Sequence, residues 1–168
     1  MADFRPRALL AHLTAHGVDF VVVGGIAATL HGSSRDTFDL DICPSMEPDN
    51  LDVLGKALVD LEARLRGVDE DAPFVPDGRT LHGMQILTLD TTLGALDVLM
   101  RPDGSPPFGQ LRRRARRMDI GRAAVAVASI ADLLEMKRAA GRAKDQADVE
   151  ELEALQRLER RLRRKAAR

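Results

Sequence analysis

Apolar residues along the chain alternate between the spacing of helices and that of strands. Leu9, Leu10 and Leu13 share one face of a predicted helix from Arg5 to His16, and Gly17 follows as its stop. Further along, leucines three and four residues apart predict an amphipathic helix over residues 49–66. Ser129 is a natural N-cap for a helix over residues 130–140. A final helix over residues 145–164 is expected to bury Val149, Leu152, Leu155, Leu158 and Leu162.

The strand pattern is clearest in two short segments. Residues 19–23 are a β-branched run ending at Gly24-Gly25, which predicts a buried strand followed by a helix over residues 26–32. Residues 38–42 alternate strictly, so one face is expected to be buried while the other carries Asp39 and Asp41. Residues 84–89 and 93–100 predict a hairpin, residues 67–79 and 101–109 predict loops, residues 110–118 a short helix, and residues 123–128 a last strand.

Composition narrows the class of protein. The 168 residues suit one domain, and 45% hydrophobic with 30% charged residues is typical of a chain that folds on its own. Cys43 is the single cysteine, which excludes an internal disulfide, and no apolar run has the length of a membrane helix. We see no signal peptide at the N-terminus. A cytoplasmic protein without membrane partners is therefore expected.

Charge is distributed unevenly along the chain. Residues 1–100 hold 7 Lys and Arg against 16 Asp and Glu, whereas residues 101–168 hold 18 against 10. This asymmetry fits an internal electrostatic clasp, a bound polyanion, or simply a solvated basic helix. The chain has no Trp or Tyr, which argues against base-stacking platforms, so any nucleic-acid contact would depend on phosphates.

Asp39, Asp41 and Asp97 form the constellation with the most chemical content. Carboxylates at i and i+2 on a strand point to the same side, where their repulsion raises a pKa unless a cation neutralises them. Mg²⁺ prefers carboxylate oxygens and substrate phosphates, and the Gly24-Gly25 turn before a helix offers backbone N–H groups to a triphosphate. Taken alone, Gly24-Gly25 could simply form a turn, and Asp39 and Asp41 could simply lie on a solvated strand face. The order and spacing of these residues together favour a functional site.

These residues resemble the nucleotidyltransferases of the DNA polymerase β type. That family has an apolar strand, Gly-Gly or Gly-Ser, a short helix, Asp-apolar-Asp on the next strand and a third aspartate later. The string from Gly24 through His31-Gly32, Arg35 and Thr37 to Ile42 is similar to the AbiEii and MenT branch, the toxins of type IV and related toxin–antitoxin systems. So are Asp132-Leu133-Leu134-Glu135-Met136-Lys137, Gly141-Arg142 and Lys144-Asp145-Gln146-Ala147-Asp148 near the end of the chain.

The resemblance implies an α+β fold, in which a small mixed β-sheet is flanked by helices and followed by a helical C-terminus. It implies one domain over residues 1–168, with a catalytic sheet core at about 18–101 and a basic, helical part at about 108–168. It implies Mg²⁺ or Mn²⁺ held by Asp39, Asp41 and Asp97, and a catalytic Lys137 beside the phosphates of a nucleoside triphosphate (NTP). The nucleotide-binding residues would be Gly24, Gly25, Arg35, Lys137, Lys144 and Asp145. Gly25 replaces the serine that is frequent in the family, so a hydroxyl contact to phosphate is lost.

The activity implied is transfer of a nucleoside monophosphate (NMP) from an NTP to an acceptor hydroxyl. RNA, at the tRNA 3′ end, is the favoured acceptor, with Arg112, Arg113, Arg114, Arg116 and Arg117 as its contacts and a cognate antitoxin as a protein partner. A catalytically inactive binding module and an enzyme acting on a protein or small molecule remain the alternatives. Lys144, Asp145 and Asp148 also suit the start of a helix, and His31 suits either a core or capping role or a substrate contact.

Overall fold

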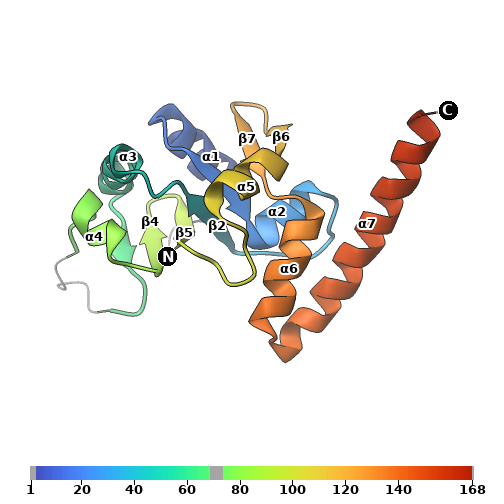
Figure 1. The fold of residues 1–168 in the computed structure, drawn as a ribbon. Helices are drawn as coiled ribbons and strands as arrows, with labels where there is room; N and C mark the ends of the chain where they lie inside the picture. Colours follow the sequence, from blue (N-terminus) through green and yellow to red (C-terminus); the bar gives the residue numbers. More distant parts are fainter. Residues whose placement is uncertain (1–2, 69–73, 168) are drawn as a thin grey trace.

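A mixed seven-stranded sheet is the centre of the computed structural model, which describes residues 3–68 and 74–167 (Figure 1). The helices are α1 (Pro6–Ala15), α2 (Gly24–Leu30), α3 (Pro48–Asp60), α4 (Gly78–His82), α5 (Phe108–Arg114), α6 (Ile130–Ala140) and α7 (Gln146–Ala166), with a 3-10 turn η1 (Ala143–Asp145). The strands are β1 (Phe20–Val23), β2 (Asp39–Pro44), β3 (Arg64–Leu65), β4 (Ile86–Thr91), β5 (Gly94–Leu99), β6 (Arg116–Asp119) and β7 (Ala124–Val127).

The strand order β3-β4-β5-β2-β1-β7-β6 places β2 at the middle of the sheet. β2 runs parallel to β5 and antiparallel to β1, and β1 runs parallel to β7. The predicted hairpin of β4 and β5 is antiparallel, as expected. The structure therefore confirms an α+β fold in which helices flank a mixed sheet.

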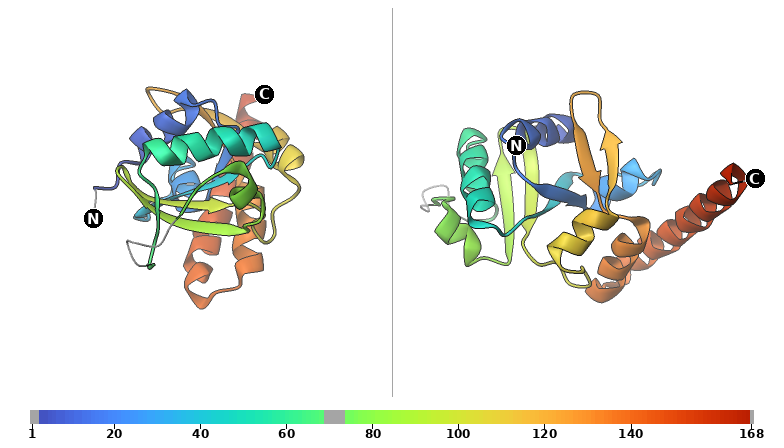
Figure 2. Two further views of the ribbon diagram at one scale, coloured as in Figure 1. Left: turned by 90° about the vertical axis from the view of Figure 1, so that its left-hand side faces the viewer. Right: turned by 45° about the horizontal axis from the view of Figure 1, so that its top comes forward.

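Helices α1 and α3 lie side by side over one face of the sheet (Figure 2). The alternation along β2 and β5 explains why this face is the core, since every second side chain on both strands is apolar and buried. The core between the sheet and these helices includes Leu40, Ile42, Leu96 and Val98 from the strands and Leu9, Leu13, Leu51, Leu54 and Leu58 from the helices. The other side of β2 and β5 is consequently free to carry polar groups.

Two predicted helices are shorter in the structure than the sequence pattern indicates. The helix predicted over residues 49–66 ends at Asp60, because Glu62 takes a positive φ of 50° and Arg64-Leu65 pair with β4 as a short edge strand. The helix predicted over residues 110–118 ends at Arg114, because residues 116–119 pair with β7. In both places a neighbouring strand overrides a helical pattern.

The segment between β3 and β4 contains a helix that the sequence pattern missed. Asp77 caps α4 by accepting a hydrogen bond from the Thr80 backbone N–H at 2.7 Å. Part of the loop predicted over residues 67–79, namely residues 69–73, lies outside the described residues.

The C-terminal helices agree with the sequence pattern except at their outer end. Ser129 caps α6 as predicted, and Gly141 ends that helix with a φ of 60°. The C-terminal half of α7 extends away from the sheet (Figures 1 and 2). Leu158 and Leu162 are therefore 50% and 58% exposed, and the prediction that they face inward is wrong. None of the described helices is long and apolar enough to cross a membrane.

Gly104 gives a test of how the loop after β5 packs against α6. Gly104 has a φ of 74°, and an added Cβ would lie 2.5 Å from the Glu135 backbone oxygen and 2.7 Å from the Ala139 Cβ. Gly121 has a φ of 93° but no atom within 4 Å of an added Cβ, so it is a matched control.

We expect Gly121→Ala to cost about 1–2 kcal/mol of the free energy of unfolding, from the left-handed backbone alone. Gly104→Ala should cost about 1–3 kcal/mol more, because the collision adds to that strain. Urea unfolding of both variants measures the difference, and equal losses would contradict this packing.

Candidate active site

The three predicted acidic residues lie together on the face of the sheet opposite α1 and α3. Asp41 on β2 is level with Asp97 on the parallel strand β5, and Asp39 is two residues earlier on the same side of β2. The buried residues Leu40, Ile42 and Leu96 alternate with them and fix which way the carboxylates point. The strand pairing thus concentrates three carboxylates at one place.

The electrostatics of Asp41 reflect this concentration of charge. Partial burial, followed by the charges of Asp39 and Asp97, raises the pKa of the Asp41 carboxyl to about 7. A backbone hydrogen bond from Gly25 and the charge of Lys137 act in the opposite direction. Metal-free Asp41 is therefore close to half-protonated at neutral pH, and a bound cation would restore its charged form.

Asp97 has one arginine neighbour that the sequence did not reveal. Arg66 Nη2 lies 3.1 Å from Asp97 Oδ1, while the same guanidinium donates hydrogen bonds to the Leu89 backbone oxygen and the Asp90 carboxylate. The contact with Asp97 lacks hydrogen-bond geometry, so within the described part of the chain Asp97 Oδ1 is a buried oxygen without a hydrogen-bond donor. Burial raises the pKa of Asp97 and the charge of Arg66 opposes this rise.

The turn at Gly24-Gly25 lies directly against the carboxylates. Val23 pairs with Asp41, so the chain leaves β1 beside that side chain. Gly24 has a φ of 65°, and a Cβ there would be 2.6 Å from the Asp41 Cγ. A Cβ at Gly25 would be 2.6 Å from the Thr37 Oγ1, which itself donates a hydrogen bond to Asp39 Oδ1 at 3.1 Å. Only glycine permits this close approach of backbone and acidic side chains.

A group of charged side chains joins α6 to the start of α7 next to the carboxylates. Lys137 Nζ lies 3.1 Å from Asp145 Oδ1 and 2.8 Å from Asp148 Oδ2. Arg142 Nε donates a hydrogen bond to Asp145 Oδ2 at 2.7 Å, which is the main reason that the pKa of Arg142 is raised, and the negative charge of Asp41 adds to this rise. Lys137 and Arg142 therefore present positive charge to the acidic site while Asp145 and Asp148 hold them in place.

The loop before β2 is fixed by α7. Arg35 forms an ion pair with Asp148, and Glu151 accepts hydrogen bonds from the Ser33 hydroxyl at 2.7 Å and the Ser34 backbone N–H at 3.0 Å. Arg35 is thus positioned by α7 rather than by Asp39 or Asp41. Lys144 is exposed and has no hydrogen bond or ion pair with other described residues, so the structure does not bring it into the group.

His31 has a structural contact. One of its ring nitrogens, Nε2, lies 2.8 Å from the Ala128 backbone oxygen, which ties the end of α2 to the end of β7. This agrees with the core or capping role considered for His31, and no contact with the carboxylates accompanies it in the described structure.

The acidic site has the donor set that Mg²⁺ or Mn²⁺ prefers. It offers carboxylate oxygens from two neighbouring strands, one of which, Asp97 Oδ1, is buried without a hydrogen-bond donor. The pKa of Asp41 is raised first by burial and then by the charges of Asp39 and Asp97, and a bound cation would offset both effects. The residues present therefore fit a divalent metal ion, and Asp39, Asp41 and Asp97 would hold it.

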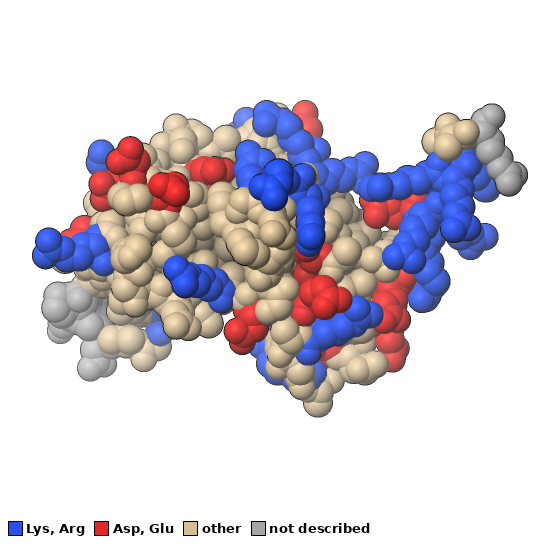
Figure 3. Space-filling view, in the orientation of Figure 1, with Lys and Arg blue, Asp and Glu red and all other residues tan. Residues whose placement is uncertain are grey.

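The arginine run after the loop is only partly available for a ligand. Arg112 pairs with Asp19, Arg114 with the buried Asp132 at 3.0 Å, and Arg116 with Glu159 at 3.8 Å. Arg113 and Arg117 are exposed and have no ion pair with described residues. Lys and Arg side chains nevertheless gather over the region of α5 and β6 and along the outer end of α7 (Figure 3).

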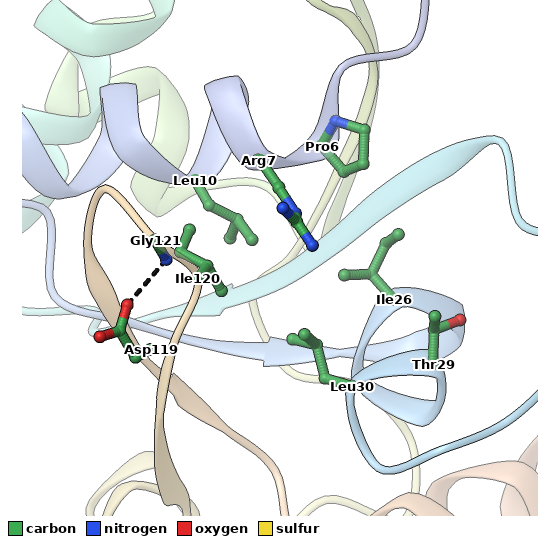
Figure 4. Close-up of a pocket in the computed structure, with 9 residues that line it drawn as sticks. All are labelled: Pro6, Arg7, Leu10, Ile26, Thr29, Leu30, Asp119, Ile120 and Gly121. Atoms are coloured by element: carbon green, nitrogen blue, oxygen red, sulfur yellow. Dashed lines mark hydrogen bonds between the residues drawn. The ribbon is translucent and has the colours of Figure 1, made fainter.

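A separate pocket of about 330 Å³ lies between α1, α2 and the turn from β6 to β7 (Figure 4). Arg7 points into it, and Leu10, Ile26 and Leu30 provide apolar walls. None of the predicted site residues lines this pocket, so we do not include it in the candidate active site.

Comparisons with solved structures identify the fold. The lincosamide antibiotic adenylyltransferase LnuA, bound to lincomycin, has a TM-score of 0.58 with 16% identity over 88% of this chain and 94% of its own. ANT(2″)-Ia in complex with adenylyl-2″-tobramycin has 0.53 with 14% identity over 94% of each chain. An antigenic nucleotidyltransferase-like protein from Paracoccidioides brasiliensis has 0.54 with 19% identity over 91% of this chain and 74% of its own.

The chain consequently shares the fold of these solved structures, which include an adenylyltransferase and a nucleotidyltransferase-like protein. No family model matches the sequence, and a search of curated proteins finds no match either. The more specific resemblance to AbiEii and MenT proteins stays a prediction.

Asp41→Asn should stabilise the metal-free protein at alkaline pH. The pKa of Asp41 is raised to about 7 in the folded chain from an ordinary value of 3.8. As the pH rises from about 4 to 7, the unfolded chain therefore loses this proton before the folded chain does, and the free energy of unfolding falls. The Asn variant avoids this cost, and its melting temperature should exceed that of the wild type at pH 8 by a few degrees, with the gap shrinking toward pH 5. Thermal unfolding in EDTA at both pH values measures this. A gap that is independent of pH would contradict the electrostatic explanation.

Arg114→Ala should destabilise the fold, whereas Arg113→Ala should not. Asp132 is buried with a 4% exposed side chain, and Arg114 is its cationic partner. Because Arg114 itself is 57% exposed, we expect a loss of about 1–2 kcal/mol rather than the full cost of breaking a buried pair. Arg113→Ala should stay within about 0.5 kcal/mol of the wild type. Urea unfolding of both variants tests the assignment, which equal stabilities would refute.

Proposed function

We propose that this chain is a metal-dependent nucleotidyltransferase that transfers an NMP from an NTP to an acceptor hydroxyl. The observation that carries this proposal is the placement of Asp39, Asp41 and Asp97 on one sheet face beside the Gly24-Gly25 turn. The nucleotidyltransferase fold supports it further. A chain that had lost this chemistry would have no reason to keep three mutually repelling carboxylates, which is why a purely binding role is the weaker hypothesis.

The reaction exchanges one phosphorus–oxygen bond for another. The acceptor oxygen bonds to the α-phosphorus of the NTP, the bond from that phosphorus to pyrophosphate breaks, and the hydroxyl proton passes to Asp97. Asp97 would take this proton on the carboxylate oxygen that does not hold a metal ion, and its burial, which raises the pKa of Asp97, favours the protonated form. Pyrophosphate then leaves with both electrons of the broken bond.

The other residues position charge around the triphosphate. Asp39 and Asp41 would share the metal ions with Asp97, and the backbone at Gly24-Gly25 would contact the phosphates where no side chain intervenes. Bound Mg²⁺ would neutralise the charge that builds up on the transferred and leaving phosphates. Lys137 and Arg142 would add positive charge from the other side, held in place by Asp145 and Asp148.

For the acceptor we propose RNA, at the tRNA 3′ end, within a toxin–antitoxin pair. The net basic charge of residues 101–168 and the exposed arginines Arg113 and Arg117 support a polyanionic partner. Arg112, Arg114 and Arg116 would also contact the RNA, either by breaking their ion pairs within the protein or while keeping them.

The antitoxin would be a protein partner, for which the exposed Leu158 and Leu162 on the outer half of α7 offer an apolar contact.

A small-molecule acceptor is the second candidate. The sheet face beside Asp97 continues onto β4 with Asp90, Thr88 and the 61% exposed Ile86, an acidic and apolar surface unlike one that attracts RNA. LnuA is a lincosamide antibiotic adenylyltransferase with lincomycin bound, and the antibiotic-resistance factor ANT(2″)-Ia is in complex with adenylyl-2″-tobramycin. A cationic or neutral polyhydroxyl compound would suit this surface.

One transfer assay tests the proposal and separates the acceptors. Purified protein is incubated with Mg²⁺, each radiolabelled NTP in turn, and either total bacterial RNA or a panel of hydroxyl-bearing antibiotics. We expect label in a tRNA-sized band, and at least about a 100-fold loss in Asp39→Asn, Asp41→Asn and Asp97→Asn, because the electrostatic stabilisation of the transferred group is removed. Asp36→Asn, an exposed carboxylate three residues before Asp39, is the matched control and should retain activity.

The outcomes distinguish the hypotheses. Label on an antibiotic but not on RNA would replace the RNA acceptor with a small molecule and leave the nucleotidyltransferase intact. Full activity in the three Asp→Asn variants would refute the site. Neither transfer nor NTP binding by the wild type would favour the inactive binding module.

A further inference from the structure

Two histidines and an aspartate form a second cluster of potential metal ligands, outside the acidic site. His12 is on α1 and His16 is the residue that follows its last turn, with ring centroids 4.3 Å apart, and Asp60 is the last residue of α3. One ligand atom from each of the three residues lies within 4.8 Å of the other two. This cluster is on the helical side of the sheet, opposite the face that carries Asp39, Asp41 and Asp97.

Each histidine already has one ring nitrogen facing a backbone carbonyl. His16 Nδ1 lies 3.0 Å from the His12 oxygen, and His12 Nε2 lies 3.1 Å from the Ala57 oxygen. Because a carbonyl oxygen only accepts hydrogen bonds, these nitrogens must carry the hydrogens. The lone pairs of the neutral rings are then on His16 Nε2 and His12 Nδ1. A ring that donates its other N–H to a backbone carbonyl is the usual arrangement of a metal-binding histidine.

The contact between His16 and Asp60 requires a cation. His16 Nε2 lies 2.8 Å from Asp60 Oδ2, and with the His16 hydrogen on Nδ1 both of these atoms are acceptors. A proton can fill this place in the metal-free chain, which would make the contact an ion pair between His16 and Asp60. A divalent transition metal would bind the same two lone pairs and gain a third ligand from His12.

We propose that His12, His16 and Asp60 form a binding site for a transition-metal ion of the Zn²⁺ type. Two imidazoles and one carboxylate with an open fourth position are a known ligand set for Zn²⁺. Tetrahedral bonds of about 2.0–2.1 Å place ligand atoms about 3.3 Å apart, so the ligand atoms, which lie within 4.8 Å of one another, would have to adjust their spacing when the ion binds. The ion would link the C-terminal ends of α1 and α3. The ligand set differs in chemistry from the all-oxygen acidic site, which suits Mg²⁺.

Co²⁺, a spectroscopic substitute for Zn²⁺, gives a direct test on the full chain. Co²⁺ is titrated at pH 7.5 with Mg²⁺ in excess, so that the acidic site does not compete for it. Tetrahedral Co²⁺ with nitrogen ligands absorbs visible light far more strongly than hydrated octahedral Co²⁺. We expect a saturable absorption band at one equivalent, which Zn²⁺ displaces, and a melting temperature that rises with Zn²⁺.

The variants identify the ligands. His16→Ala and Asp60→Asn should each weaken Co²⁺ binding at least tenfold. His82→Ala, which removes an exposed histidine on α4, should bind as the wild type does. Circular dichroism verifies that each variant is folded, and Asp60→Asn keeps an oxygen acceptor for His16. No absorption band with the wild type, or equal binding by His16→Ala, would overturn the proposal and leave an ion pair between His16 and Asp60.

Discussion

Three carboxylates on adjacent parallel strands are the constraint on which the rest of this structure depends. Asp41 and Asp97 are level across β2 and β5, and their mutual repulsion opposes folding. The opposite faces of the same strands resist this repulsion, because Leu40, Ile42 and Leu96 are fully buried against α1 and α3. Rotation of either strand to separate the carboxylates would expose this core. The apolar side of the sheet therefore holds the acidic side in an arrangement that it would not adopt alone.

The uneven charge along the chain does not operate as a general clasp between its two parts. Among the described residues, residues 1–100 are joined to residues 101–168 by the ion pairs of Arg112 with Asp19 and of Arg35 with Asp148. The partners of Arg114, Arg116 and Arg138 instead lie within residues 101–168. The connection that matters for the site is more local. Glu151 and Asp148 on α7 fix residues 33–35, and this loop leads directly into Asp39. A helix from the end of the chain thus sets the position of a strand near its beginning.

The sequence predicted what depends on periodicity and on fixed spacing. Strand β2 with its two faces, the Ser129 cap and the helix it begins all appear as expected, because each depends on contacts within one segment. The errors occur where a distant partner decides the structure. Arg64-Leu65 and residues 116–119 become strands only because β4 and β7 offer free edges, and Arg66 reaches Asp97 only through that pairing. Leu158 and Leu162 fit the helical stripe but lie on the outer half of α7, which extends away from the sheet and leaves them exposed.

The charge balance of the site constrains the order of binding in the proposed reaction. Lys137 and Arg142 present positive charge to Asp41, but their contacts with Asp145 and Asp148 offset part of that charge. Arg66 is shared between Asp97 and Asp90. A triphosphate approaching this metal-free site would meet three carboxylates beside the close backbone of Gly24-Gly25. In the proposed reaction, divalent cations would therefore bind before the nucleotide or together with it. The same carboxylate repulsion that opposes folding would thereby make nucleotide binding depend on the metal.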